Sequence, residues 1–170
     1  MAKIIPKIDE ASIQRRSPWR KMEKNFIPES EDISILKKEG LTLEEKALID
    51  EGFAAHAVSS TGCDGDMREF ALVAKRKGAF IGALTARLFW GSLHIKHLFV
   101  LSDSRNKGIG KQLVEAALKI GKENHCRFAT VETMSFQALD FYRKLGFKID
   151  FSREGYDRGC TFHYLSKPLM

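Results

Sequence analysis

The order of apolar and polar residues along the chain predicts a mixture of strands and helices. Residues 93–101 carry β-branched, aromatic and aliphatic side chains at the density of a strand, and polar residues then interrupt the pattern. From Lys111 the apolar residues recur at helical spacing, which predicts a helix directly after a short turn. The same criteria predict further strands at residues 33–38, 69–76, 79–90, 128–133, 147–153 and 160–166.

Two more helices complete the predicted set. Thr42 and Glu45 form a capping box that begins a helix running to about His56, and a short helix is expected at residues 137–145. The element order predicts an α/β (α+β) fold, in which a mixed sheet of about seven strands is flanked by helices. Residues 1–31 have mixed charge, three prolines and no sustained periodicity, so we interpret them as an N-terminal arm before one domain at residues 32–170.

The turn after residues 93–101 has the composition of an anion-binding site. Gly108 and Gly110 let the main chain approach a ligand, and the free N–H groups of the helix that follows favour negative charge. Arg105, Lys107 and Lys111 add positive charge at the same point. A helix start with two glycines and some lysines is also a common surface feature, so this pattern alone leaves both interpretations open.

Two motifs in the expected order resemble the GNAT acetyltransferase superfamily. RNKGIG at residues 105–110 is similar to the family's R/Q-x-x-G-x-G/A motif, and ALDFYRKLGF at residues 138–147 to its A-x-x-F-Y-x-K-x-G-F signature. The resemblance covers about residues 70–167 and implies the GNAT fold, in which the sheet is splayed between strands 4 and 5. In this sequence these are the predicted strands at residues 93–101 and 128–133. It also implies acetyl-CoA as co-substrate and no metal.

The resemblance further implies which residues hold the coenzyme. Residues 98–100 are similar to the bulged strand that the family lays along the pantetheine arm, and the Val100 N–H would polarise the acetyl carbonyl. Ser135 stands where many members have asparagine, so that contact departs from the family. The implied coenzyme-binding residues are Leu98, Phe99, Val100, Arg105, Asn106, Lys107, Gly108, Ile109, Gly110, Lys111, Ser135 and Ala138.

Acyl transfer to an amine needs a proton acceptor and a donor for the leaving thiolate. His94 is a candidate base, because counted back from Arg105 it stands where family members place a glutamate or, in arylalkylamine acetyltransferases, a histidine. Glu132 is the competing base, and Tyr142 in the second motif is the candidate acid. Each has an alternative: a hydrogen-bonded strand histidine, a solvated carboxylate and a packed core tyrosine. Strand alternation predicts that His94 and His97 point to opposite faces, His97 to the helix-covered one.

The activity expected from these features is acetyl-CoA-dependent N-acetylation. The acceptor is a primary amine of a small molecule or peptide, which attacks directly in a ternary complex; the alternative is a non-catalytic acyl-CoA-binding sensor. No motif names the amine. Aromatic candidates for its cleft are Phe53, His56, Phe89, Trp90, Phe136 and Tyr156, and carboxylate candidates are Glu154, Asp157, Asp64 and Asp66.

Composition narrows the kinds of domain organisation, site and partner that the chain can have. With 170 residues the chain is long enough for one substantial core. Three cysteines without a C-x-x-C pair suggest neither a disulfide framework nor a metal site, and no apolar run has membrane-spanning length, so we expect a cytoplasmic protein without a membrane partner. The net charge of +6 is scattered, so no nucleic-acid partner is expected, and a homodimer is one assembly the sequence allows. The one basic cluster comprises Arg15, Arg16, Arg20, Lys21 and Lys24.

Overall fold

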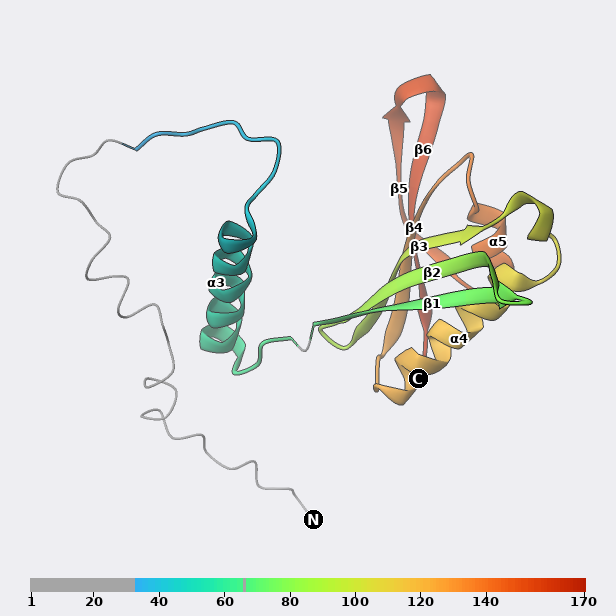
Figure 1. Cartoon of the computed structure of the whole chain (residues 1–170), viewed down its shortest axis with the longest axis horizontal. Coiled ribbons are helices and arrows are strands. Elements are labelled where there is room, and N and C mark those ends of the chain that lie inside the picture. The colour runs from blue at the N-terminus through green and yellow to red at the C-terminus, as the bar shows by residue number, and fades with distance from the viewer. Residues whose placement is uncertain (1–32, 66) are drawn as a thin grey trace, which may run out of the picture. The chain divides into compact units, whose positions relative to one another are not determined.

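The computed structural model describes residues 33–65 and 67–170. The predicted N-terminal arm with its basic cluster, and Asp66, lie outside the described residues. The chain divides between Gly62 and Cys63 into two compact units (Figure 1). The predicted domain boundary at residue 32 stays a prediction.

The described part of the first unit contains one helix, α3 (Leu43–Thr61). The predicted capping box is confirmed, since the Thr42 hydroxyl accepts from the Glu45 N–H and the Glu45 carboxylate accepts from the Thr42 N–H. The prediction that the helix ends near His56 was wrong: it continues to a left-handed Gly62 with φ of 76°, because Ala57 and Val58 extend it. Residues 33–38 form no strand, because no described strand pairs with them and an isolated strand has no ladder of hydrogen bonds.

The second unit is a mixed six-stranded sheet with two helices, which confirms the predicted fold class although one strand fewer is present among the described residues. The strand order is β1-β2-β3-β4-β6-β5, in which only β3 and β4 are parallel neighbours. The elements, shown in Figure 1, are β1 (Arg68–Arg76), β2 (Ala79–Phe89), β3 (Ser92–Val100), α4 (Ile109–Glu123), β4 (Phe128–Met134), α5 (Leu139–Lys144), β5 (Lys148–Tyr156) and β6 (Cys160–Pro168).

The predicted splay of the sheet is confirmed between β3 and β4. These strands pair in parallel from Ser92 with Phe128 to Ile95 with Val131, and the pairing stops there. Beyond this point β4 continues to pair with β6 on its other side, as far as Met134 with Phe162. Among the described strands, the second half of β3 therefore pairs with β2 alone.

One hydrophobic core lies between the sheet and α4, which packs across β1 to β4. The helical spacing in the sequence identified the buried face of α4 correctly. Gly121 allows the close approach of helix and sheet, since a Cβ there would lie 3.2 Å from Leu93 and 3.0 Å from Leu169. The buried face comprises Leu113, Val114, Ala117, Leu118 and Gly121. No helix in the described ranges is both long enough and apolar enough to cross a membrane.

A β-bulge in β3 changes the faces that its side chains occupy. His97 pairs with Thr85 and Ile95 pairs with Ala86, so Lys96 is an extra residue in the ladder. The prediction that His94 and His97 point to opposite faces was therefore wrong. Ile95 and Leu98 both belong to the core beside α4, whereas His94 and His97 both lie on the opposite face.

Candidate active site

The turn between β3 and α4 presents a run of unused backbone donors, here called the cradle (residues 106–111). Within the described ranges, none of the backbone N–H groups of residues 106–111 donates to another protein group, and the first donor in the helix is Gln112, to Gly108. Asn106 and Gly108 have φ of 58° and 78°, and left-handed residues at alternate positions curve the chain into a concave nest. Such a nest at a helix N-terminus binds phosphate or another anion.

The cationic side chains around the cradle are held by backbone carbonyls near the turn or by a carboxylate on α4. The Arg105 Nε donates to the Val100 carbonyl at 3.0 Å, which ties the turn back to the end of β3. The Lys107 Nζ donates to the Asp103 carbonyl at 2.8 Å, and Lys111 forms an ion pair with Glu115 at 3.7 Å on α4. Their positive charges thus stay close to the cradle, where they add to the helix dipole.

The cradle continues into the unpaired edge of β3. After Ile95 this edge has no β4 partner, so the backbone groups of residues 96–100 that point away from β2 are available to an extended ligand, except the Val100 carbonyl, which already accepts from Arg105. An extended chain with amide groups can bind such an edge as an added strand does. Leu98 and Val100 pack against the core, while Phe99 is exposed.

Two candidate bases meet on the face of the sheet opposite α4. The His94 Nε2 lies 3.9 Å from Glu132 Oε1, near the point where the pairing of β3 with β4 ends. The His94 side chain is 19% exposed and that of Glu132 is 48% exposed, so the imidazole is shielded while the carboxylate faces solvent. A single nitrogen can lie within hydrogen-bonding distance of both groups at this separation.

The surroundings of His94 keep its imidazole neutral. Burial lowers the pKa of His94 below 6.5, the positive charges of Arg87 and Lys96 lower it further, and Glu132 opposes them. Arg87 is the β2 residue that pairs with His94, and its guanidinium lies 4.9 Å over the Phe89 ring. Neutral imidazole is the form that accepts a proton.

Tyr142 lies in the core on α5 and is 5% exposed. Its ring packs edge-on against Phe141 and Phe147, at centroid distances of 5.1 and 5.7 Å. Phe141 in turn lies against the cradle, because a Cβ on Gly110 would be 3.4 Å from the Phe141 ring. Burial raises the pKa of Tyr142 to about 12, so its hydroxyl remains protonated. Within the part of the chain that is described, this hydroxyl has no hydrogen-bond partner.

The junction between β4 and α5 is fixed by two hydroxyl groups. The Thr133 hydroxyl accepts from the Ala138 N–H at 3.2 Å, at the start of α5. The Ser135 hydroxyl accepts from the Thr161 N–H at 3.1 Å, while the Ser135 N–H donates to the Thr161 carbonyl. These bonds occupy polar groups of Ser135 and Ala138, and they hold α5 and therefore Tyr142 in place.

Sequence reasoning missed Thr133 and Arg87. Thr133 positions α5 through a bond across five residues, and neither motif includes it. Arg87 pairs with His94 in the part of the β2–β3 ladder between the turn and the bulge, where Phe89 pairs with Ser92. The two-residue turn at Trp90 and Gly91 fixes this pairing, and the residue pattern, which predicts a strand as far as residue 90, does not place the turn there.

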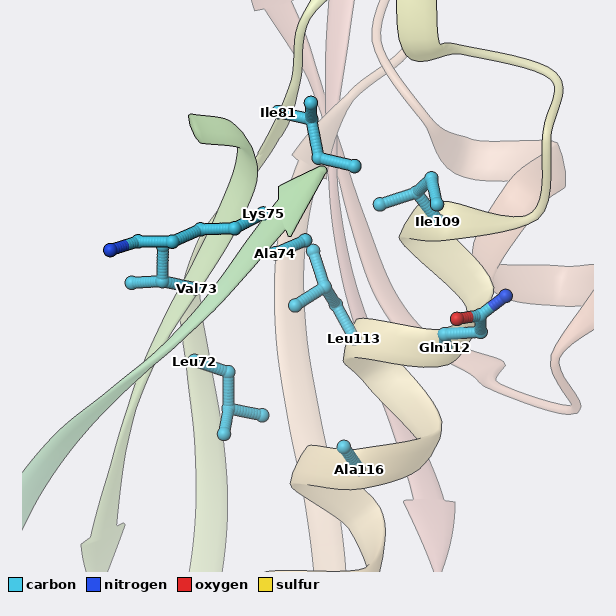
Figure 2. Close-up of a pocket in the computed structure, with 9 residues that line it drawn as sticks. All are labelled: Leu72, Val73, Ala74, Lys75, Ile81, Ile109, Gln112, Leu113 and Ala116. Carbon is cyan, nitrogen blue, oxygen red and sulfur yellow. The ribbon is translucent and has the colours of Figure 1, made fainter. Parts of the chain in front are cut away.

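A first cleft of about 420 Å³ lies between β1, β2 and the first turns of α4. Figure 2 shows Ile81 and Leu113 projecting toward this space, whereas Lys75 projects to the other side of β1. Gln112 provides a polar group at its margin. The cleft thus has an apolar lining with no ionisable group directed into it from the residues drawn, which fits packing better than proton chemistry.

The aromatic candidates for the acceptor cleft belong to both units, and those of the second unit lie at two separate places. Phe136 and Tyr156 line a second cleft beside the end of β4. Phe89 and Trp90 lie at the turn between β2 and β3, where the Trp90 N–H donates to the Gly65 carbonyl. Phe53 and His56 belong to α3 in the first unit. Of the carboxylate candidates, Asp157 lines the second cleft.

The chain matches a known family over most of its length. The sequence profile of the Acetyltransferase (GNAT) family matches residues 37–147. Blasticidin-S acetyltransferase of Streptomyces morookaense is 34% identical over 94 residues, which are 55% of this chain and 69% of that protein. Peptidyl-lysine N-acetyltransferase YjaB of Salmonella typhimurium is 37% identical over 73 residues, which are 43% of this chain and only 48% of that protein.

Solved structures agree with the fold. An acetyltransferase from Bacillus cereus superposes with a TM-score of 0.67 at 29% identity, covering 78% of this chain and 97% of that one. A Bacillus anthracis acetyltransferase assigned to streptothricin, solved in complex with acetyl coenzyme A, superposes with a TM-score of 0.55 at 22% identity. That match covers 59% of this chain and 62% of the other and supports the fold alone.

Proposed function

Because the chain belongs to the GNAT acetyltransferase family and is an acetyltransferase, we propose that it transfers the acetyl group of acetyl-CoA to a primary amine. The acceptor is a small molecule or a peptide, and its amine attacks the thioester directly in a ternary complex. The observation that carries this proposal is the unused donor cradle, which continues into the open edge of β3 beside His94 and Glu132.

The coenzyme would lie along the cradle and β3. Its diphosphate accepts hydrogen bonds from the backbone of residues 106–111, beside Arg105 and Lys111. Its pantetheine amides pair with the β3 edge at residues 98–100, which lacks a β4 partner. Ser135 and Ala138 line the far side of the splay, with the N–H group of each already used inside the protein.

The acetyl transfer would proceed by one addition and one elimination. His94, with Glu132 beside it, accepts a proton as the amine nitrogen bonds to the carbonyl carbon. The Val100 N–H stabilises the carbonyl oxygen as it becomes negative. The carbon–sulfur bond then breaks, and Tyr142, which is protonated at neutral pH, donates its hydrogen to the departing sulfur.

The names of two relatives support an acceptor that is a small molecule or a peptide amine. One relative is named for an antibiotic and another for the lysine side chain of proteins. We further propose that the acetyltransferase domain begins near residue 32 and that the protein acts in the cytoplasm. A homodimer is consistent with this proposal.

The pH dependence of turnover tests the base. We expect turnover to rise with pH through an apparent pKa below 6.5, because the pKa of His94 is lowered by burial, Arg87 and Lys96. His94→Ala should remove this rising limb of the pH profile and leave acetyl-CoA binding unchanged. Glu132→Gln should shift the limb to lower pH, since the carboxylate raises that pKa, and Arg87→Met should shift it to higher pH. Thiol release measured between pH 5 and 9 gives all four profiles.

Two amines of different basicity provide the control. A limb that moves with the pKa of the amine means that the enzyme takes neutral amine from solution and that neither residue is the base. A larger loss in Glu132→Gln than in His94→Ala would transfer the role to Glu132. Acetyl-CoA binding without thiol release for every amine would instead support an acyl-CoA sensor.

A further inference from the structure

The β5–β6 hairpin forms a second cleft at its junction with the end of β4, here called the hairpin cleft (Figure 1 shows the three strands). Its volume is about 510 Å³, within the range of small-molecule sites. The residues that line it are Met134, Phe136, Gly155, Tyr156, Asp157, Arg158 and Cys160. Neither of the two family motifs contains any of these residues.

The hairpin cleft opens on the same face of the sheet as the candidate bases. Glu132 pairs with Tyr164 and Met134 pairs with Phe162, so Met134 lies two residues beyond Glu132 on that face. Two residues of a strand span about 7 Å. An acceptor in the cleft with a chain of two or three bonds can therefore bring its nitrogen to Glu132, whose carboxylate is 3.9 Å from His94.

The lining of the hairpin cleft favours a flat unsaturated ring. Phe136 is 69% exposed and Tyr156 is 43% exposed, although both are large apolar side chains. The Tyr156 ring is already stacked with Phe162 at 6.1 Å and an interplanar angle of 29°. Aromatic faces and the Met134 thioether bind planar rings more strongly than flexible alkyl chains of equal size.

Charge around the hairpin cleft favours one ammonium group at the end of the cleft nearest Glu132, here called its inner end. Glu132 supplies a carboxylate on the sheet side. At the outer end Asp157 is followed directly by Arg158, so the two charges offset each other and offer no net attraction to a second cation. The additional charges of a polyamine therefore gain nothing in this cleft, which favours a monoamine.

We propose that the hairpin cleft binds a planar unsaturated ring of the acceptor, and that the acceptor is a monoamine whose amino group lies at Glu132 and His94. This inference rests on the proposed function and adds the substrate class. The ring is held by Phe136, Tyr156 and Met134, and the short linker to the amine follows β4.

Matched amines and one side-chain truncation test this assignment. Thiol release from acetyl-CoA is measured with 2-phenylethylamine, hexylamine and spermidine. Wild type should show a kcat/KM at least tenfold higher for 2-phenylethylamine than for the other two. Phe136→Ala should lower kcat/KM for 2-phenylethylamine about tenfold, mainly through KM, and leave hexylamine within about twofold. Phe80→Ala, which truncates an exposed phenylalanine on β2, is the matched control and should change neither.

Equal kcat/KM for 2-phenylethylamine and hexylamine in wild type would overturn the assignment, as would an equal loss for both amines in Phe136→Ala. If no amine is acetylated, the proposed function fails, and the cleft is then tested by titrating 2-phenylethylamine calorimetrically into protein saturated with coenzyme A. Binding that is lost in Phe136→Ala but kept in Phe80→Ala supports the cleft independently. Absence of binding to wild type contradicts it.

Discussion

Tyr142→Phe is expected to turn over acetyl-CoA at least a hundredfold more slowly than wild type, which is the usual contribution of a general acid. The substitution removes only the hydroxyl, because the ring would keep its edge-on contacts with Phe141 and Phe147. Since the pKa of Tyr142 is about 12, the wild-type group is protonated at every pH of the assay, and its loss should lower kcat without creating a new pH limb. The measurement is kcat from thiol release at saturating substrates.

Binding and stability separate this result from misfolding. The Tyr142→Phe protein should bind acetyl-CoA with a Kd within a fewfold of wild type and should keep its melting temperature, because the hydroxyl has no hydrogen-bond partner in the described chain. Wild-type turnover in this variant would reduce Tyr142 to a packing residue. A large fall in melting temperature would instead reveal a structural role for the hydroxyl.

The parts of the site that could be predicted from the sequence are those encoded by neighbouring residues. The cradle is one continuous segment, in which Gly108 and Asn106 adopt left-handed conformations and the helix begins at once, so its composition is enough to indicate anion binding. The buried face of α4 follows from helical spacing in the same way. Both depend on local backbone geometry and not on distant partners.

The parts that could not be predicted depend on register between strands. The bulge at Lys96 leaves no separate signal in the residue pattern, and it moves His97 to the face on which His94 lies. The pairing of Arg87 with His94 is set by the turn at Trp90 and Gly91, which the residue pattern does not place because it predicts a strand as far as residue 90. Residues 33–38 illustrate the opposite error, because a pattern typical of a strand forms one only where a partner strand is available.

Gly108→Leu is expected to abolish the stabilisation that acetyl-CoA gives to the wild-type protein. A ligand at about a hundred times its Kd stabilises the folded state by about 2.7 kcal/mol. For a chain of this size that corresponds to a rise in melting temperature of roughly 5–10 °C. The Gly108 backbone lies in the middle of the cradle, and of the described residues only the Gln112 side-chain amide lies within 4 Å of a Cβ placed on Gly108. A leucine there would project into the space that the diphosphate needs, so the rise should fall below about 1 °C.

Gly78→Leu is the matched control for backbone strain. Gly78 in the β1–β2 turn has φ of 83° against 78° for Gly108, and no atom of residues 33–65 or 67–170 lies within 4 Å of a Cβ placed on Gly78. Both substitutions therefore place a leucine in the left-handed region, at a cost of roughly 1–2 kcal/mol each. The two variants should melt at similar temperatures without ligand, and only Gly78→Leu should keep the full rise with acetyl-CoA. Loss of the rise in both variants would assign the effect to backbone strain, and a full rise in Gly108→Leu would move the diphosphate site away from the cradle.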